Sequence, residues 1–143
     1  MENSLNNRQR IAERYFEGFY NSATIEEATQ RIDEVVADHF VDHSPQFGSA
    51  PDREGFKQVI SAIKTTFGQV YRVEELIVEG DLFVGRWRAE VTHRGDFMGI
   101  PPTGKQFPVT GITIYRIVDG KITDHWEHFD QVGIMQQIGN PNG

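Results

Sequence analysis

The spacing of hydrophobic residues predicts that the first half of the chain is helical. From residue 4 to residue 21, apolar side chains recur at helical spacing and form one stripe. The stripe consists of Ile11, Ala12, Tyr15, Phe16, Phe19 and Tyr20. Thr24 and Glu27 have the spacing of a capping box, so a second helix should begin there and fade near residues 38–40. Asp52 precedes a third stripe that Gly68 closes, which predicts a third helix.

The period changes in the second half, where polar and apolar residues alternate. The predicted strands cover residues 71–78, 82–92, 105–118 and 121–129. Asp119-Gly120 separates the last two strands and is a turn pair that tolerates positive φ. Residues 131–138 should form a short helix that ends at Gly139. This order predicts an α+β fold, with N-terminal helices packed on a curved antiparallel sheet.

The strand predicted over residues 105–118 is apolar on both of its faces. Thr113 and Tyr115 share one face, and Ile112 and Ile114 share the other. The predicted helices are too few to cover a sheet on both sides. We therefore expect the outer face of the sheet to meet another subunit.

Length and composition predict a single globular domain over residues 1–143, with 38% apolar and 24% charged residues. The net charge of −7 and the scattered basic residues argue against a nucleic-acid partner, because phosphate binding draws on clustered Lys and Arg. The chain has no cysteine, which excludes disulfides and thiol catalysis. We expect a cytoplasmic protein with no membrane partner, since neither a signal peptide nor a long apolar run is present.

The strand predicted over residues 121–129 carries the candidate chemistry. His125, Glu127 and His128 stand there among aromatic residues, and ionisable groups in apolar surroundings are typical of a reaction pocket. The two histidines are three positions apart, which sends them to opposite faces of a strand and disfavours a shared metal site. No nucleotide-binding loop is present. We therefore expect no metal and no cofactor.

The pattern leaves open which face of this strand lines a pocket. One face carries Thr123, His125, Glu127 and Phe129, and the other carries Asp124, Trp126, His128 and Asp130. If the first face is covered, Glu127 lies among aromatic side chains and is suited to proton transfer. If the second face is covered, Glu127 is a solvated charge at the edge of the sheet.

Three further groups have both a functional and a structural interpretation. Asp42 and His43 follow the second predicted helix, where they can reach into a cavity beneath the helices or cap a turn. His93 lies on the apolar side of its strand with Trp87, either facing a ligand or buried against a backbone carbonyl. Most of the aromatic stripe on the first helix is core, and at most one of its hydroxyls, such as that of Tyr20, points to a ligand.

Three motifs in order, GDFMGIPPTG, YRIVDGKI and WEHFDQVGIMQQIG, resemble the SnoaL-like polyketide cyclase family. The resemblance spans nearly the whole chain and is strongest from Gly80 onward. It implies a cone-shaped fold, in which a strongly bent sheet wraps against helices, encloses one hydrophobic pocket and usually forms a homodimer through its outer surface. Because this fold hosts many activities, the motifs indicate the family more than one reaction.

The resemblance also implies a mechanism and a set of site residues. Members that close polyketide rings use one carboxylate as acid and base in an intramolecular aldol condensation, without metal or organic cofactor. Their aspartate matches Glu127, and a histidine on their preceding strand matches Thr113. We expect Glu127, His43 and His125 to be catalytic on a hydrophobic, ketone-bearing small molecule. The residues expected to bind substrate are Tyr20, Asp42, Trp87, His93, Phe97, Met98, Thr113, Tyr115 and Phe129.

Two other functions stay open at this point. The chain could be a non-catalytic carrier or sensor of a hydrophobic metabolite, because Thr113 cannot take a proton at neutral pH as the family's histidine can. It could also be an epoxide hydrolase or a hydroxylase on the same fold. Epoxide hydrolysis needs a second carboxylate near Glu127, for which Asp42 is the candidate.

Overall fold

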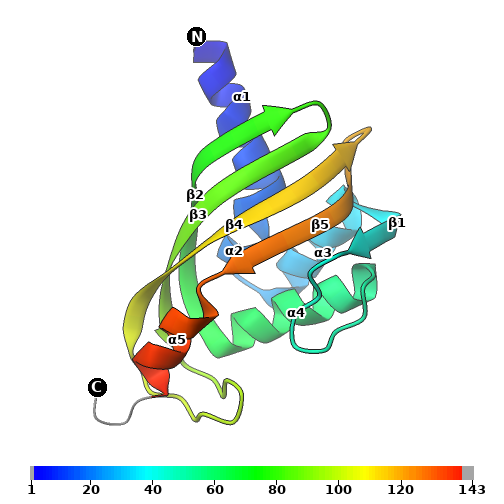
Figure 1. Cartoon of the computed structure of the whole chain (residues 1–143). Coiled ribbons are helices and arrows are strands. Elements are labelled where there is room, and N and C mark those ends of the chain that lie inside the picture. Colours follow the sequence, from blue (N-terminus) through cyan, green and yellow to red (C-terminus); the bar gives the residue numbers. More distant parts are fainter. Residues whose placement is uncertain (1, 140–143) are drawn as a thin grey trace.

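The chain folds into helices packed against one curved sheet, which confirms the predicted α+β class. The computed structural model describes residues 2–139. Its helical segments are α1 (Glu2–Ala12), the π-helical turn η1 (Glu13–Glu17), α2 (Gly18–Asn21), α3 (Ile25–Val35), α4 (Arg53–Thr66) and α5 (Gln131–Ile138). Its strands are β1 (Val36–Asp42), β2 (Phe67–Glu79), β3 (Leu82–His93), β4 (Gln106–Val118) and β5 (Lys121–Phe129), in the sheet order β1-β5-β4-β3-β2. Figure 1 shows α1 to α4 gathered on one side of the bent sheet.

Hydrogen bonds at the helix caps explain where the helices begin. The backbone N–H of Glu27 donates to Thr24 Oγ1 at 3.1 Å, while the Glu27 carboxylate accepts the N–H of Ala23 at 3.1 Å, so the capping box of α3 is confirmed. Asp52 is the N-cap of α4, as predicted. The predicted end of this helix is wrong, because α4 stops before Gly68, which lies in β2.

The strand β1 is an element that the sequence pattern did not predict. Residues 38–40, expected as the fading end of a helix, are extended and belong to β1. This strand runs parallel to β5, with Asp42 opposite His125, so the sheet is mixed and not wholly antiparallel. The register shifts between Val36 and Val41, which removes the regular alternation by which a strand is recognised.

Two glycines on the inner face of the sheet let large rings lie directly against the backbone. A Cβ at Gly111 would lie 2.4 Å from Cζ2 of Trp87, and a Cβ at Gly85 would lie 2.6 Å from Cε1 of Phe16. Both distances are shorter than a van der Waals contact, so each position requires glycine. The Phe16 ring packs in turn on Tyr115, with centroids 4.8 Å apart. This contact joins the N-terminal helices to the middle of the sheet.

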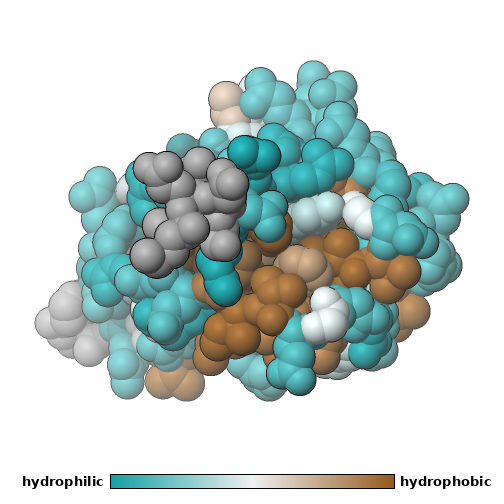
Figure 2. All heavy atoms as spheres, turned by 90° about the horizontal axis from the view of Figure 1, so that it is seen from above, coloured by the Kyte–Doolittle hydropathy of each residue, from teal (hydrophilic) through white to brown (hydrophobic). Residues whose placement is uncertain are grey.

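Hydrophobic side chains also reach the surface along the strands. The exposed ones on β2 and β4 are Val70, Ile77, Val78, Ile112 and Val118. Figure 2 shows hydrophobic surface gathered near the middle of the side seen from above, with hydrophilic residues around it. None of the helices within residues 2–139 combines the length and the apolar content needed to cross a membrane. The exposed apolar positions on the strands are candidates for contact with another molecule.

Replacing Gly85 with alanine should destabilise the protein, because the added methyl group overlaps the Phe16 ring. We expect G85A to lower the free energy of unfolding by about 1–3 kcal/mol, the usual cost of overpacking a core. Urea denaturation measures this difference. If the Phe16 ring is the cause, G85A combined with F16L will cost less than the sum of the two single changes. Strictly additive costs would contradict the contact.

Candidate active site

A hydrophobic cavity of about 330 Å³ lies between the helices and the inner face of the sheet. The residues expected from the sequence that line it are Tyr20, Trp87, Phe97, Met98, Glu127 and Phe129. Its polar lining also includes Gln69, Tyr71 and Asp96. Among the described residues, the wall holds two carboxylates, Glu127 and Asp96, and no lysine, arginine or histidine.

The carboxylate of Glu127 is held at the cavity wall by two neighbours. The hydroxyl of Thr113 donates to Glu127 Oε1 at 2.8 Å, and this hydroxyl accepts the indole N–H of Trp87 at 2.9 Å. The second neighbour is His125, whose Nε2 lies 3.3 Å from the same Glu127 oxygen. The Glu127 side chain is only 10% exposed. The inner face of β5 is therefore the one that carries His125, Glu127 and Phe129, a choice that the pattern left open.

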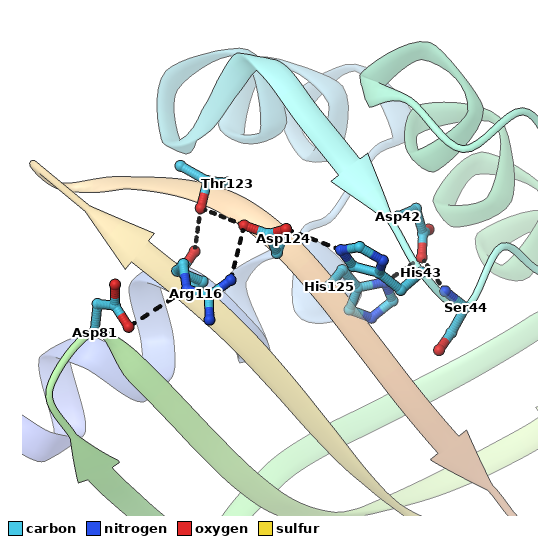
Figure 3. Close-up of polar contacts among 8 residues, drawn as sticks. All are labelled: Asp42, His43, Ser44, Asp81, Arg116, Thr123, Asp124 and His125. Carbon is cyan, nitrogen blue, oxygen red and sulfur yellow. Dashed lines mark hydrogen bonds and ion pairs between the residues drawn. The ribbon is translucent and has the colours of Figure 1, made fainter.

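His125 links Glu127 to a second buried carboxylate. Its Nδ1 lies 3.0 Å from Asp42 Oδ1, and this oxygen also accepts the backbone N–H of Ser44 at 2.9 Å. Figure 3 shows Asp42 on β1 pointing to His125 on β5. Burial alone would lower the pKa of the His125 imidazole, but its hydrogen bonds to Asp42 and Glu127 outweigh burial and raise the pKa to about 9. At neutral pH, His125 is therefore a buried cation between two carboxylates.

Two tyrosines stand on the cavity wall as hydrogen-bond donors. The rings of Tyr20 and Tyr71 are stacked with centroids 4.5 Å apart, and Tyr71 stacks in turn on Trp87 at 4.9 Å. Burial, followed by the charge of Glu127, raises the pKa of both phenols well above the usual value, so both keep their protons at neutral pH. The Tyr71 hydroxyl is hydrogen-bonded to Thr113, whereas the Tyr20 hydroxyl can donate to an oxygen of a bound molecule.

Tyr71 is a lining residue that the sequence analysis did not single out. It is the first residue of the predicted strand 71–78, and alternation along this strand puts it on the same face as Val73. That alternation is the signal that could have found it. Gln69 and Asp96 lie outside the predicted strands, so no periodic pattern points to them.

His43 lies on the outer face of the sheet, apart from Glu127. Its Nε2 is 2.8 Å from Asp124 Oδ2, and its ring stacks on Trp126 with centroids 4.6 Å apart. Figure 3 shows His43 and Asp124 beside Arg116, which also contacts Asp124. Neighbouring residues of an extended chain point to opposite faces, so His43 faces outward while Asp42, the residue before it, is buried. The expected catalytic role of His43 therefore has no support in the geometry, because the imidazole is directed away from the cavity.

The remaining residues expected to bind substrate are buried but do not line the cavity. Asp42 and Thr113 lie behind the wall, where they contact His125 and Glu127 respectively. Tyr115 stacks on His125 with centroids 5.2 Å apart.

His93 is also buried away from the cavity and packs against Phe67, with ring centroids 5.6 Å apart. Its Nδ1 accepts the backbone N–H of Thr103 at 3.2 Å, whereas its Nε2 has no partner among the described residues. His93 thus holds the far end of the loop 94–104, which brings Phe97 and Met98 to the cavity. Within residues 2–139, no group of three or more His, Asp or Glu side chains is arranged to hold a metal ion.

Comparison with known proteins places this geometry in a family. The family model described as SnoaL-like polyketide cyclase matches residues 12–138 of the chain. Nogalonic acid methyl ester cyclase of Streptomyces nogalater is 30% identical over 119 residues, which cover 79% of this chain and 87% of that protein. Aklanonic acid methyl ester cyclase DauD of Streptomyces sp. (strain C5) is 29% identical over 136 residues, covering 92% and 81% of the two chains.

Solved structures support the same assignment. TsrD from Streptomyces laurentii superposes with a TM-score of 0.78 and 27% sequence identity, over 94% of this chain and 96% of that one. TsrD therefore has the same bent sheet with its helices.

The buried histidine predicts how stability depends on pH. The pKa of His125 is about 9 in the folded chain against 6.5 for a free imidazole, so the folded state binds the proton more tightly. The stabilisation of the folded state by this proton is fully present below pH 6.5 and is lost as the pH rises through about 9. Its full size is about 3 kcal/mol, at about 1.4 kcal/mol for each unit of pKa. Urea denaturation at a series of pH values measures it.

A titration of the imidazole nitrogens by NMR separates His125 from other groups. In D42N the raised pKa of His125 should fall, because one of the two anionic partners is gone. D124N is the matched control, since Asp124 pairs with His43 on the outer face. If His125 titrates near or below 6.5 in the native chain, the proposed buried cation does not exist.

Proposed function

The chain belongs to the SnoaL-like polyketide cyclase family, and we propose that it closes a ring in a hydrophobic, ketone-bearing polyketide by proton transfer at Glu127. The observation that carries this proposal is the Glu127 carboxylate, which Thr113 and His125 hold at the wall of an apolar cavity. Two relatives named as cyclases of polyketide methyl esters support the substrate class.

The first step is removal of a proton from carbon. A C–H bond between two carbonyl groups is acidic enough for a carboxylate base held within hydrogen-bond reach. Glu127 takes this proton, and the phenol of Tyr20 donates a hydrogen bond to the enolate oxygen that forms. The cation at His125 offsets part of the negative charge that gathers in the site.

The second step forms the ring. The enolate carbon attacks a ketone carbon of the same molecule, and the new C–C bond turns that ketone oxygen into an alkoxide. The alkoxide takes the proton back from Glu127, so the carboxylate is regenerated. The aldol addition therefore needs no external oxidant, reductant or net proton.

The cavity supplies the geometry that this reaction requires. Ring closure demands that two carbons of one flexible chain approach each other in a folded conformation. The aromatic wall formed by Trp87, Phe97 and Phe129 can pack against such a folded chain and exclude water. A positioned base contributes roughly 10²–10⁴-fold, so the remainder of the rate enhancement falls to this positioning.

Thr113 fits this mechanism although it cannot titrate. Its hydroxyl hydrogen is donated to Glu127, because an ionised carboxylate can only accept, and its oxygen accepts the Trp87 indole N–H. The threonine thus fixes the orientation of the carboxylate, while His125 on the neighbouring strand supplies a group that can hold a proton. We propose that His125 acts in place of the histidine that family cyclases carry at the position of Thr113.

Replacing Glu127 with glutamine should remove turnover and leave binding largely intact, because the amide keeps the shape but cannot take a proton. We expect kcat to fall about 10²–10⁴-fold. The assay follows ring closure of nogalonic and aklanonic acids and of their methyl esters by chromatography. E127D should keep part of the activity, and E90Q on the exposed outer face should keep all of it.

Two outcomes would count against this proposal. Turnover by E127Q equal to that of the native chain would remove Glu127 from the mechanism. Tight binding of these acids and esters, with no turnover of any of them by the native chain, would favour a carrier instead.

We also propose that two copies of the chain pair through the outer face of the sheet. Ile112 on β4 is 47% exposed there, and Val118 on the same strand is 41% exposed. Hydrophobic residues on the open side of a sheet are stabilised when another surface covers them. A homodimer would cover both positions without involving the cavity.

A charge placed in this interface should separate the two copies. We expect I112E to shift the mass measured by light scattering from dimer to monomer, because a buried glutamate would lack a partner. V132E is the matched control, since Val132 is exposed but lies on the helix α5 and not on a strand. A native chain that is already monomeric at micromolar concentration would refute the dimer.

A further inference from the structure

A second cleft of about 290 Å³ lies next to the cavity and differs from it in character. The two share the side chains of Tyr20, Phe67 and Gln69, so only one layer of residues separates them. Whereas the described cavity wall holds carboxylates and no basic group, the cleft is lined by both Lys64 and Arg94. The combined site therefore has an acidic, hydrophobic end and a cationic end.

The two cations in the cleft are not neutralised by the protein. The Arg94 guanidinium donates one hydrogen bond, from Nη2 to the backbone oxygen of Lys64 at 3.1 Å. Among the described residues, neither side chain has a carboxylate within 4.0 Å, although Arg86, Arg88 and several others do. Burial, and then the nearby charge of Arg94, lower the pKa of Lys64. Two like charges in one cleft are stabilised when an anion binds between them.

Both cations are positioned before any ligand arrives. Lys64 Nζ donates to the backbone oxygen of Ser22 at 2.6 Å and to that of Tyr20 at 3.3 Å. A Cβ at Gly68 would lie 3.0 Å from Nη1 of Arg94, so the glycine lets the guanidinium lie close to the start of β2. Fixed donors lose less conformational entropy on binding than mobile surface side chains.

The Glu27 carboxylate lies near enough to affect Lys64 but does not form an ion pair with it. It opposes the lowering of the Lys64 pKa, yet no ion pair joins the two side chains. The Glu27 carboxylate instead accepts the backbone N–H of Ala23 at 3.1 Å, as part of the cap of α3. Two cations and one distant carboxylate leave the cleft with a net positive charge.

We propose that this cationic cleft binds a carboxylate of the substrate, so that the chain acts on a polyketide free acid. The inference rests on the proposed function, because it assigns the second end of the same substrate. The ketone-bearing body lies against Glu127, and the acid end lies between Lys64 and Arg94. A guanidinium can bind a carboxylate through two parallel hydrogen bonds. A methyl ester, the form named for two relatives, carries no charge for the cleft to bind.

The experiment compares a keto acid with its own ester. The probes are 4-oxo-4-(2-naphthyl)butanoic acid and its methyl ester, and calorimetry on the full chain gives both dissociation constants. We expect the acid to bind at least about tenfold more tightly at low salt, with a smaller preference at about 0.2 M salt because screening weakens the attraction. R94Q should reduce the preference for the acid, and R94K should retain part of it.

The control is R88Q, which removes the same charge from the exposed outer face of β3. It should keep the preference of the native chain for the acid. Equal affinity of the native chain for acid and ester overturns the inference, and so does a preference that R94Q leaves as large as in the native chain. If R94Q fails to fold, the native preference, its salt dependence and R94K decide the question.

Binding is measured without turnover, so this inference and the proposed function can fail separately. A strong preference for the acid without cyclisation of any substrate would refute only the cyclase. Cyclisation of methyl esters at rates equal to those of the acids, with equal affinities, would refute only the anion site.

Discussion

The structure depends on the burial of three ionisable side chains along one line of hydrogen bonds. Asp42, His125 and Glu127 are all removed from water, and isolated charges in such a place would cost several kcal/mol each. The arrangement of carboxylate, imidazolium and carboxylate reduces this cost because each charge faces an opposite one. Buried charges that are paired and hydrogen-bonded are tolerated, whereas a single unpaired one is not. The pairing of β1 with β5 is therefore essential, because it places Asp42 opposite His125.

The two sides of the Glu127 carboxylate have different roles. On one side is an imidazole that can exchange a proton, and on the other is a chain of neutral donors that ends at the Trp87 indole. The neutral donors fix the direction of the carboxylate, while the imidazole sets the local charge. Two protonated tyrosines complete the wall, Tyr71 from β2 and Tyr20 from α2.

The sequence was sufficient for the parts of the fold that have a regular period. The helical stripe through Phe16, the capping box at Thr24 and the turn at Asp119-Gly120 each correspond to an observed element or turn. The family could also be identified, because its motifs run through the last strands. The strand β1 could not be found, since its register shifts within seven residues and hides the alternation.

The site was predicted less completely, for physical reasons. Each face of β5 carries both apolar and ionisable residues, so only the packed structure could assign Glu127 to the inside. The position of His43 on the outer face could not be predicted without β1, because the extended backbone at the end of that strand sends Asp42 and His43 to opposite faces. The cleft of Lys64 and Arg94 joins residues from a helix and from a loop after β3, and no local pattern connects them.

The bond between Asp42 and His125 has a consequence for how such a protein can diversify. The same contact fastens the edge strand to the sheet and sets how many protons the active site holds. Substitutions there are penalised twice, in folding and in chemistry, which leaves little freedom for evolution to explore. Met98, in contrast, lies on a loop at the rim and is 61% exposed, so new substrate shapes can be accommodated there at small structural risk. Natural or laboratory selection for altered product range should accumulate changes in that loop before any appear at the edge strand.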